Sequence, residues 1–589
     1  MKTITRLFVA IYHFLLWFNC IIIIRAFFYE LSRQFTAIWA IISGKEIFNI
    51  VIIKSSRYDS EDGFVWRSLK AILPSNTLAT IYSMVKDIQV NWRLGTNIKI
   101  ITREFDETAQ NVNPSRIARL CNLLPSKTLV MIVGVQTNEF ARASDIALDF
   151  REKGIQVIIG GFHVSGVLKQ FPKDGSELSI KAHKEFGLDK LINSGVSIFA
   201  GEAEGRVLKI LEDFQKGNLK EIYNYLDEKP DLFFEVTPEP VWSIIPHFVF
   251  SKSSTIDACR GCPFGCVFCT IRNVQGTKIR ARGIDVFCDT IRSNWKKGIN
   301  SYFFTSDNAS RDPFWRERFD ALIKMRQEED IKISFMMQVD TQCHKILDFI
   351  PKASAAGCEA VFIGMETVNP DNLPEVGKGQ NHVDEYQEFD DEWRKYGVAT
   401  QYGYMIGLPN DTFESIIRDI NFLINLGPDL ITFFIATPLP GADDHRDLFR
   451  ANVAMDSDAN TYDCFSGIVT KHPLMSNEDL LKAYHYAWEK MYSVENMVRI
   501  LKNNDRKYYW DRLWSLIWYK YALDVAQRHP MITGFIRLRN RHSRRKTFPK
   551  MNFLEFQIYN FKEKFIMWKR TLKLAKTMLK VWQQSYHKK

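Results

Sequence analysis

Short apolar runs alternate with amphipathic segments from about residue 48 onward. The runs 129–134 and 156–161 have the length of buried strands and end in glycine-bearing turns, and the segment between them, 141–153, has helical spacing. A short buried strand followed by a turn is expected at 48–58, and further strands are expected at 97–102 and 196–200. Alternation of strands and helices with short turns predicts an α/β domain over 48–225 with a Rossmann-like, doubly wound parallel sheet.

A second series of strands and helices follows a proline-rich linker, 226–250. Strands are expected just before residue 259 and at 301–305, 333–338, 360–364, 400–406 and 430–434, with helices such as 385–395 and 413–426 between them. These units predict a partial (β/α)6 barrel over 251–470. Active residues of such barrels lie at the carboxyl ends of the strands.

The N-terminal segment 1–45 is unusually apolar. After Arg6, residues 7–24 carry no formal charge, and apolar residues continue to about Ile42. Eighteen residues is near the lower limit for a membrane-spanning helix, and the segment lacks the small-residue cleavage site of a secretory signal. We expect a helical, membrane-prone segment that spans, enters or lies on a membrane; the alternative is a helix that covers a domain surface.

The C-terminal region, 471–589, is expected to be helical and basic. Apolar residues there recur with the 4-3-4-3 spacing of one helix face, at Phe561, Phe565, Trp568, Leu572, Ala575, Leu579 and Trp582. Flanking lysines suit an anionic membrane surface, but the helix could equally pack on its own domain. The basic run 537–546 makes RNA an alternative partner. Nucleic acid is not favoured, because the sequence contains no recognisable RNA-binding module.

Composition changes this picture mainly through the cysteines. The length of 589 residues suffices for two or three domains. The net charge of +10 is moderate and gathers near the C-terminus. The ten cysteines form no evident disulfide framework, but four of them fall within residues 259–269. This clustering indicates a cofactor site.

Cys262, Cys266 and Cys269 have the spacing C-x3-C-x2-C, with Phe268 just before the last one. Three thiolates on a short loop can hold three irons of a [4Fe-4S] cluster and leave the fourth iron open for a small molecule. A zinc site would need a second ligand pair farther away, and a two-cluster ferredoxin would need a second cysteine run. Cys259 is expected to be a structural thiol, because the fourth iron must stay free.

This loop and the strand ends beyond it resemble the radical SAM superfamily. The resemblance implies that the open iron binds S-adenosylmethionine (SAM) and that reduction yields a 5′-deoxyadenosyl radical. It places Phe268 beside the adenine, Asp307 and Asn308 near the methionine amino group, and Glu366 at the ribose or amine. It places the segment that contains Gly403, Ile406 and Gly407 along the adenine.

Residues 48–225 resemble the cobalamin-binding domain that precedes the radical SAM domain in one branch of this superfamily. The matching segments are GVQTN, IIGGFHVSG and AGEAEG. The resemblance implies cobalamin contacts at Gly134, Gln136, Thr137, Asn138, Gly160, Gly161, His163, Gly201 and Glu202. Because the D-x-H-x-x-G segment is absent, we expect His163 to be a loop contact and not a ligand of cobalt. A nucleotide-binding or structural domain is the alternative.

In the methyltransferases of this branch, one SAM methylates cobalamin and a second supplies the radical that activates an inert carbon. The resemblance therefore implies C-methylation. The two ends of the chain suggest a lipid or isoprenoid-like substrate and a cytoplasmic location at the inner face of the cell membrane, with an external electron donor such as flavodoxin or ferredoxin. The alternatives are cyclisation or oxidation of a non-lipid small molecule or RNA, and a non-catalytic cobalamin or redox sensor.

Overall fold

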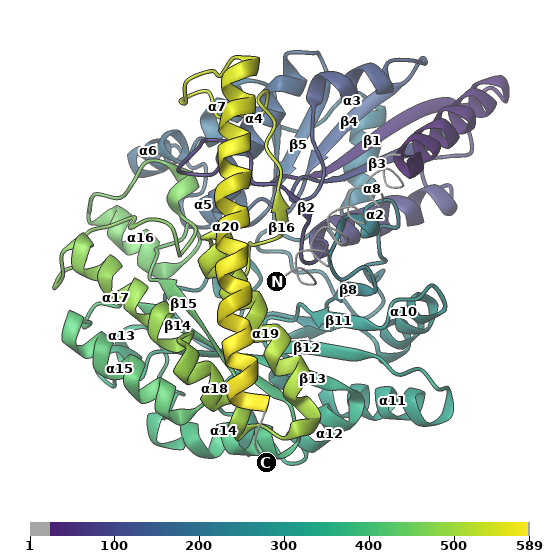
Figure 1. Ribbon diagram of the computed structural model, residues 1–589. Coiled ribbons are helices and arrows are strands. Elements are labelled where there is room, and N and C mark those ends of the chain that lie inside the picture. Colours follow the sequence, from purple (N-terminus) through teal and green to yellow (C-terminus); the bar gives the residue numbers. More distant parts are fainter. Residues whose placement is uncertain (1–23, 587–589) are drawn as a thin grey trace.

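The computed structural model of the protein describes residues 24–586. Two six-stranded parallel sheets follow each other along the chain, the first in purple to blue and the second in teal to green (Figure 1). The expected α/β fold with helical extensions is confirmed.

The first sheet has the strand order β3-β1-β4-β5-β6-β7, with all neighbours parallel. On β1, Phe48 and Ile50 face one side of the sheet, whereas Val51 and Ile53 face the other. Because side chains alternate along each strand, both faces are apolar and both are covered by helices. The strands are β1 (Glu46–Lys54), β3 (Ile98–Asp106), β4 (Lys127–Ile132), β5 (Gln156–Gly160), β6 (Ser197–Ala200) and β7 (Ile222–Asn224). The helices are α2 (Asn76–Val90) and α8 (Val207–Gln215) on one face, and α3 (Pro114–Cys121), α4 (Phe140–Arg151), α5 (Phe162–Gln170) and α7 (Leu188–Asn193) on the other; α6 (Glu177–Glu185) precedes α7.

The second sheet has the order β15-β14-β13-β12-β11-β8 and is also parallel. Strands that follow each other in this order along the chain are typical of a (β/α) barrel, which here stays open between the edge strands β8 and β15. The strands are β8 (Ser253–Ile256), β11 (Ser301–Phe304), β12 (Ser334–Val339), β13 (Cys358–Glu366), β14 (Ala399–Ile406) and β15 (Leu430–Ile435). The helices of this unit are α10 (Ile284–Lys296), α11 (Trp315–Glu328), α12 (Phe349–Ala356), α13 (Asn372–Glu375), α14 (Tyr386–Lys395) and α15 (Phe413–Leu426).

The C-terminal region is helical and covers the barrel. It contains α17 (Asn477–Met491), α18 (Val494–Asn503), α19 (Tyr509–Tyr521) and the long α20 (Phe553–Tyr586), after α16 (Asp443–Arg450). The yellow helix α20 runs past both sheets (Figure 1). Near its start Phe556 packs on Phe64 of the first unit, with ring centres 5.7 Å apart, and near its end Met578 and Val581 join the core of the barrel.

The periodicity of α20 predicts the helix, but its buried face differs from the apolar stripe seen in the sequence. Phe556, Leu574, Met578 and Val581 are buried. Of the stripe, Phe561, Phe565, Trp568 and Leu579 remain 43–72% exposed. The helix therefore packs on its own protein and still presents apolar side chains to the surroundings.

The basic run 537–546 is occupied by contacts within the protein. Its ion pairs are Arg537 with Asp59 and Asp62, Arg539 with Asp62 and Glu563, and Arg545 with Asp458. These contacts hold the C-terminal region on the first unit and account for much of the run's charge.

At the other end, a helix covers residues 24–42. The run 7–24 that suggested a membrane-spanning helix lies outside the described residues except for its last position. Within residues 24–586, no helix combines the length and the apolar composition needed to cross a bilayer.

Candidate active site between the two sheets

The carboxyl ends of the two sheets enclose a common cavity of about 310 Å³. From the first sheet it is lined by Gly134, Gly160 and Gly201, which follow or end β4, β5 and β6. From the second sheet it is lined by Asp257 and by Thr305 and Asp307, which follow β8 and β11. Ligands of open α/β sheets bind at this edge.

Glycines form the wall on the side of the first sheet. Gly161 has φ 148°, and a Cβ at this position would lie 2.1 Å from the backbone nitrogen of Val135. A Cβ on Gly134 would approach Thr77 to 3.0 Å. Side chains here would narrow the cavity or displace the loops that form it, which explains why the turns carry glycine.

The cavity combines an apolar wall with a few polar groups. Its inner wall is apolar, formed by Ile81, Met131, Ile158, Phe199, Val207 and Ile210. Hydroxyl groups of Thr77, Thr80 and Ser165 also line it. Two buried lining atoms, Asn76 Oδ1 and Thr305 Oγ1, have no hydrogen-bond partner within residues 24–586. Orphaned buried acceptors and donors indicate that a polar ligand belongs here.

Five of the nine residues expected to contact cobalamin line this cavity: Gly134, Gly160, Gly161, Gly201 and Glu202. Gln136, Thr137, Asn138 and His163 are not among its lining residues. His163 is fully buried; its ring lies 3.1 Å from the Phe186 carbonyl oxygen and 3.3 Å from Thr137 Oγ1. Both ring nitrogens thus have protein partners, and burial lowers the pKa of His163 to about 4.

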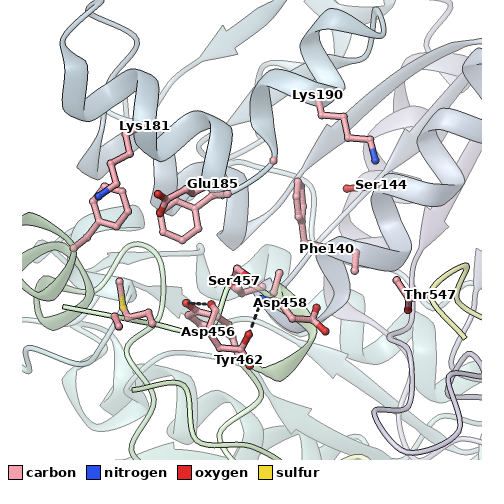
Figure 2. Close-up of a pocket in the computed structure, with 18 of the residues that line it drawn as sticks. Phe140, Ser144, Lys181, Glu185, Lys190, Asp456, Ser457, Asp458, Tyr462 and Thr547 are labelled. Carbon is pink, nitrogen blue, oxygen red and sulfur yellow. Dashed lines mark hydrogen bonds between the residues drawn. The ribbon is translucent and has the colours of Figure 1, made fainter. Parts of the chain in front are cut away.

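A larger cavity, about 770 Å³, is lined by residues of α4, α6 and the loop 452–459 (Figure 2). Phe140 and Lys190 come from the first unit, and Asp456 and Tyr462 from the second. Its charges are mixed, and Arg545 already pairs with Asp458. We therefore assign the active site to the smaller cavity, which adjoins the cysteine loop.

The cysteine loop connects β9 (Cys259–Arg260) to α9 (Ile271–Val274). Burial raises the pKa of the Cys262 and Cys266 thiols, and it raises that of Cys269 to about 12 together with the neighbouring thiols of Cys266 and Cys262. The three thiols are therefore close enough for the charge of one thiolate to disfavour ionisation of the next. The backbone at Phe264 and Ile271 lowers the pKa of the Cys262 and Cys269 thiols and so offsets part of this effect.

The arrangement fits a cluster better than a single ion. No three His, Cys, Asp or Glu side chains of the described chain could hold one metal ion together. A [4Fe-4S] cluster puts each thiolate on a different iron, so its ligands stand farther apart. Binding of the cluster would release the protons of the three thiols. The amide nitrogen of Gln380, which lies against Cys266, is buried without a hydrogen-bond partner in the described residues.

Cys259 lies behind the loop. It is fully buried, its sulfur is 3.9 Å from the Asn308 carbonyl oxygen, and burial raises its pKa well above the usual range. Its backbone belongs to the antiparallel pair of β9 and β10 (Arg280–Ala281), called the β9–β10 hairpin below, in which Cys259 faces Ala281. These contacts are those of a structural thiol.

Glu366 ends β13 in a strained conformation, with φ 65°. A non-glycine residue in this region is unusual and often marks a functional position. Its carboxylate lies 3.1 Å from the ammonium of Lys378. A Cβ on Gly364 would come within 2.7 Å of this carboxylate and 3.2 Å of the ammonium, so the glycine leaves room for the ion pair.

Phe268 lies against the end of strand β14, and the expected contact of both with adenine stays a prediction. Phe268 packs in an apolar group with Val376, Met405 and Leu408. Ile406 is buried at the end of β14, and the backbone amide of Gly407 donates to Asp411 at 2.9 Å. A Cβ on Gly403 would meet the ring of Phe362 at 2.7 Å. The carboxyl end of β14 therefore lies beside Phe268, the residue before Cys269.

Asp307 and Asn308 hold the cysteine loop from the end of β11. Asp307 accepts a hydrogen bond of 2.8 Å from the Gly261 amide, and burial raises its pKa to about 6. The side chain of Asn308 lies against the Cys262 thiol and donates to Asp340 at 2.9 Å. Both residues are therefore near the loop; their expected contact with SAM stays a prediction.

A buried network of ion pairs joins the two units at the loop. Arg260 contacts Glu202 at 3.1 Å, Glu204 at 2.5 Å and Asp257 at 2.9 Å. Arg280 also reaches Glu202, and Arg282 reaches Asp257. Glu202 thus lines the cavity and also anchors the residue that lies two positions before Cys262.

A second close contact joins α5 to the barrel. A Cβ on Gly166 would lie 2.2 Å from the Pro440 carbonyl oxygen, and one on Gly441 would lie 2.9 Å from the Gly166 Cα. Gly441 also approaches Thr270, the residue after Cys269. Small residues therefore let the first unit pack directly on the end of the cysteine loop.

Sequence reasoning missed the segment that covers the cysteine loop. Gly377 has φ 68°, and a Cβ there would lie 2.4 Å from the Gly265 carbonyl oxygen. The Val267 amide donates to the Val376 carbonyl oxygen at 3.2 Å. Although burial opposes it, Glu366 raises the pKa of Lys378, so this buried lysine stays charged. In the sequence, only the glycine–lysine–glycine run 377–379 marks this covering segment, and such a run is not a recognised cofactor motif.

Comparison with known proteins agrees with this geometry. The model of the radical SAM superfamily matches residues 256–423. The chain is 24% identical over 388 residues, 61% of its length and 78% of the relative's, to a bacteriochlorophyllide d C-8(2)-methyltransferase of Chlorobaculum tepidum. It is 28% identical over 255 residues, 42% of its length, to the C-12(1)-methyltransferase of the same organism, of which the match spans about half (54%).

Among solved structures, the cobalamin-dependent SAM radical enzyme OxsB with aqua-cobalamin and SAM bound is similar in fold, with a TM-score of 0.52 and 12% identity. The similarity covers 92% of this chain and 84% of OxsB. It therefore includes the first unit as well as the barrel. With its three-cysteine loop, the chain contains a radical SAM domain, which uses a [4Fe-4S] cluster and SAM, and together with its glycine-walled first unit it has the fold of a cobalamin-dependent radical SAM enzyme.

Proposed function

We propose that the protein is a C-methyltransferase that replaces a hydrogen atom on an unactivated carbon of its substrate by a methyl group. When bound, the cluster and SAM supply the hydrogen-abstracting radical and cobalamin carries the methyl group. The overall reaction balances with two SAM and two electrons per substrate, giving the methylated product, S-adenosylhomocysteine, methionine and 5′-deoxyadenosine. An external one-electron donor such as flavodoxin or ferredoxin supplies the electrons.

The observation that carries this proposal is the shared wall between the cavity and the cysteine loop. Arg260 and Asp307 line the cavity, and Asp307 accepts the Gly261 amide one residue before Cys262. Cofactors held on the two sides would therefore face each other, as transfer of a group between them requires. The methyltransferases of Chlorobaculum tepidum support the same reaction class.

The chain's own residues position SAM. Cys262, Cys266 and Cys269 would hold the cluster. The ammonium of Lys378 and the carboxylate of Glu366, 3.1 Å apart, complement the carboxylate and ammonium of the methionyl group. Phe268 with Met405 offers an apolar surface for the adenine. Packing of the two units, with Cys259 and Arg282 fully buried behind the loop, excludes water from this region.

We propose a lipid or isoprenoid-like substrate and action at the inner face of the cell membrane. Support comes from the apolar run 7–24 and from the exposed apolar residues of helix 24–42 and α20. Comparative lipid mass spectrometry of a deletion strain and its parent tests this substrate class: a lipid that loses 14 mass units in the deletion strain supports it. An unchanged lipid profile with a changed soluble metabolite would contradict it.

The reaction class is tested with purified enzyme, reconstituted anaerobically with iron, sulfide and cobalamin and supplied with SAM labelled in the methyl group. A methyltransferase forms both S-adenosylhomocysteine and 5′-deoxyadenosine and labels its product. A cyclase or oxidase of this family would form 5′-deoxyadenosine without a labelled product, and a sensor would form neither.

A further inference from the structure

The helix over residues 24–42 docks on the protein through its polar side and presents its apolar side outward. Eight apolar residues, 39–71% exposed, form the outer face: Ile24, Phe27, Phe28, Leu31, Phe35, Ile38, Trp39 and Ile42. At 100° per residue, they fall within about 120° of the helix circumference. This is the reverse of the pattern of a helix that covers the core of a soluble domain.

Specific polar contacts fix this orientation. Glu30 pairs with Arg103 at 2.7 Å, and Arg33 pairs with Glu104 at 2.6 Å. Arg103 and Glu104 are buried on the edge strand β3, and Ala37 packs in an apolar group with Ile47 and Ile101 of the first sheet. Rolling the helix to bury its aromatic side would leave these charges unpaired inside the protein, which is strongly unfavourable.

The surroundings of the outer face are apolar and basic. Trp92 is 41% exposed next to the end of the helix, with the Lys45 ammonium 4.1 Å from its ring centre. Leu123 is 62% exposed beside Leu124, which packs on the inner side of the helix. Arg25, Arg116 and Arg119 are exposed and form no ion pair within residues 24–586. Gln34 bonds to the Leu120 carbonyl oxygen, so α3 and its arginines lie next to the helix.

We propose that this outer face lies in the surface of an anionic lipid bilayer. Aromatic and aliphatic residues on one helix side, with basic residues at the rim, are the features of an interfacial helix. The apolar run 7–24 leads directly into the helix. That run carries no formal charge, so if it covered the outer face it would itself present apolar residues to water; the bilayer is the occupant that accommodates both. This membrane contact does not depend on which reaction the enzyme performs.

The contact is tested by mapping lipid cross-links on the full-length protein. Vesicles of phosphatidylcholine and phosphatidylglycerol carry a trace of a lipid with a photoreactive group in its acyl chain. Trypsin cuts after Arg25, Arg33 and Lys45, which releases the two peptides 26–33 and 34–45. Both should carry lipid, at residues of the outer face. The peptide 346–352, which contains the 76% exposed Leu347 on the barrel, is the internal control and should carry none.

Charge is tested separately with Arg116→Gln/Arg119→Gln. This variant should bind anionic vesicles about tenfold or more weakly at low salt, because each basic side chain near the surface contributes about a fivefold gain. Its binding to neutral vesicles should not change. The matched control Lys324→Gln/Lys332→Gln, on exposed lysines of the barrel side, should bind as the parent does.

Three outcomes would overturn the proposal. The first is a full-length protein that does not float with vesicles. The second is flotation with lipid on α20 peptides and none on 26–45. The third is a protein that is dimeric in vesicle-free solution and becomes monomeric in Phe35→Ser/Trp39→Ser, which would make the outer face a contact between two copies. None of these outcomes bears on methyl transfer, so the reaction class and the membrane contact fail independently, whereas the proposed membrane location fails together with the contact.

Discussion

The cysteine loop depends on a residue that has no side chain. Gly377 lies more than a hundred positions after the cysteines, yet its Cα faces the backbone of Gly265 and Cys266. The three candidate ligand cysteines stand out in the sequence because their spacing within one loop is itself the signal. Gly377 and Lys378 do not, because their role arises only when the end of β13 folds back over that loop.

Gly377→Ala should disturb the cluster, whereas Gly379→Ala should not. The added Cβ would lie 2.4 Å from a backbone oxygen, and the left-handed backbone alone costs about 1–2 kcal/mol for a non-glycine residue. At Gly379 nothing lies within 4 Å of a new Cβ. Iron and sulfide content after reconstitution, together with the cluster's visible absorption, measures this. Equal iron content in both variants would contradict the role given to Gly377.

Cys262→Ala, Cys266→Ala and Cys269→Ala should each abolish reductive cleavage of SAM, because each removes one of three iron ligands. Cys259→Ala should keep it, since this thiol is buried behind the loop. Iron quantification and an assay for 5′-deoxyadenosine separate the two groups. Full activity of Cys266→Ala would disprove the cluster assignment.

His163 should make the protein less stable in acid. Its pKa is lowered from 6.5 to about 4, first by burial. As the pH falls from 6.5 towards 4, the unfolded chain gains a proton that folded His163 does not accept, so up to about 3 kcal/mol of stability is lost. His163→Phe should flatten the pH dependence of thermal unfolding, and the exposed control His485→Phe should not. The absorption spectrum of bound cobalamin should be the same in His163→Phe; a changed cobalt spectrum would make His163 an axial ligand.

At the scale of elements, the strands of both units other than β7, and the helices α4, α14 and α15, follow from hydrophobic runs and glycine turns in the sequence. The contacts between elements do not. Glu202 was expected to contact cobalamin, and its pairing with Arg260 and Arg280 joins β6 to the β9–β10 hairpin. The α20 stripe is a similar case: periodicity identifies the helix, but the buried side is chosen by Phe64 and the barrel helices, which lie far away in the sequence.

Arg260→Met should loosen the joint between the units. Removing one partner of a buried ion-pair network leaves carboxylates unpaired and costs about 3–5 kcal/mol. The control Arg292→Met breaks exposed pairs with Asp289 and Glu329, worth about 0–1 kcal/mol. Thermal unfolding and the cobalamin retained after gel filtration are the measurements. If Arg260→Met behaves like Arg292→Met in both, the network does not hold the cavity together.

For the whole molecule, the central feature is that two parallel sheets turn their carboxyl ends toward one cavity. Each sheet could be predicted separately, and the resemblance of each to a known domain suggested its cofactor. Their mutual placement could not be predicted, because it rests on contacts between distant parts of the sequence. Examples are the contact of Gly166 with Pro440 and the packing of α20 on both units. This placement is what makes transfer between two cofactors physically reasonable.

The most direct test of the account is a product count under reducing conditions with the reconstituted enzyme and the lipid extract of its own cells. With cobalamin present, S-adenosylhomocysteine and 5′-deoxyadenosine should form in equal amounts, and methyl label should enter a product. Without cobalamin, 5′-deoxyadenosine should still form while S-adenosylhomocysteine and the labelled product disappear. Formation of 5′-deoxyadenosine alone, with cobalamin bound, would contradict the methyltransferase account.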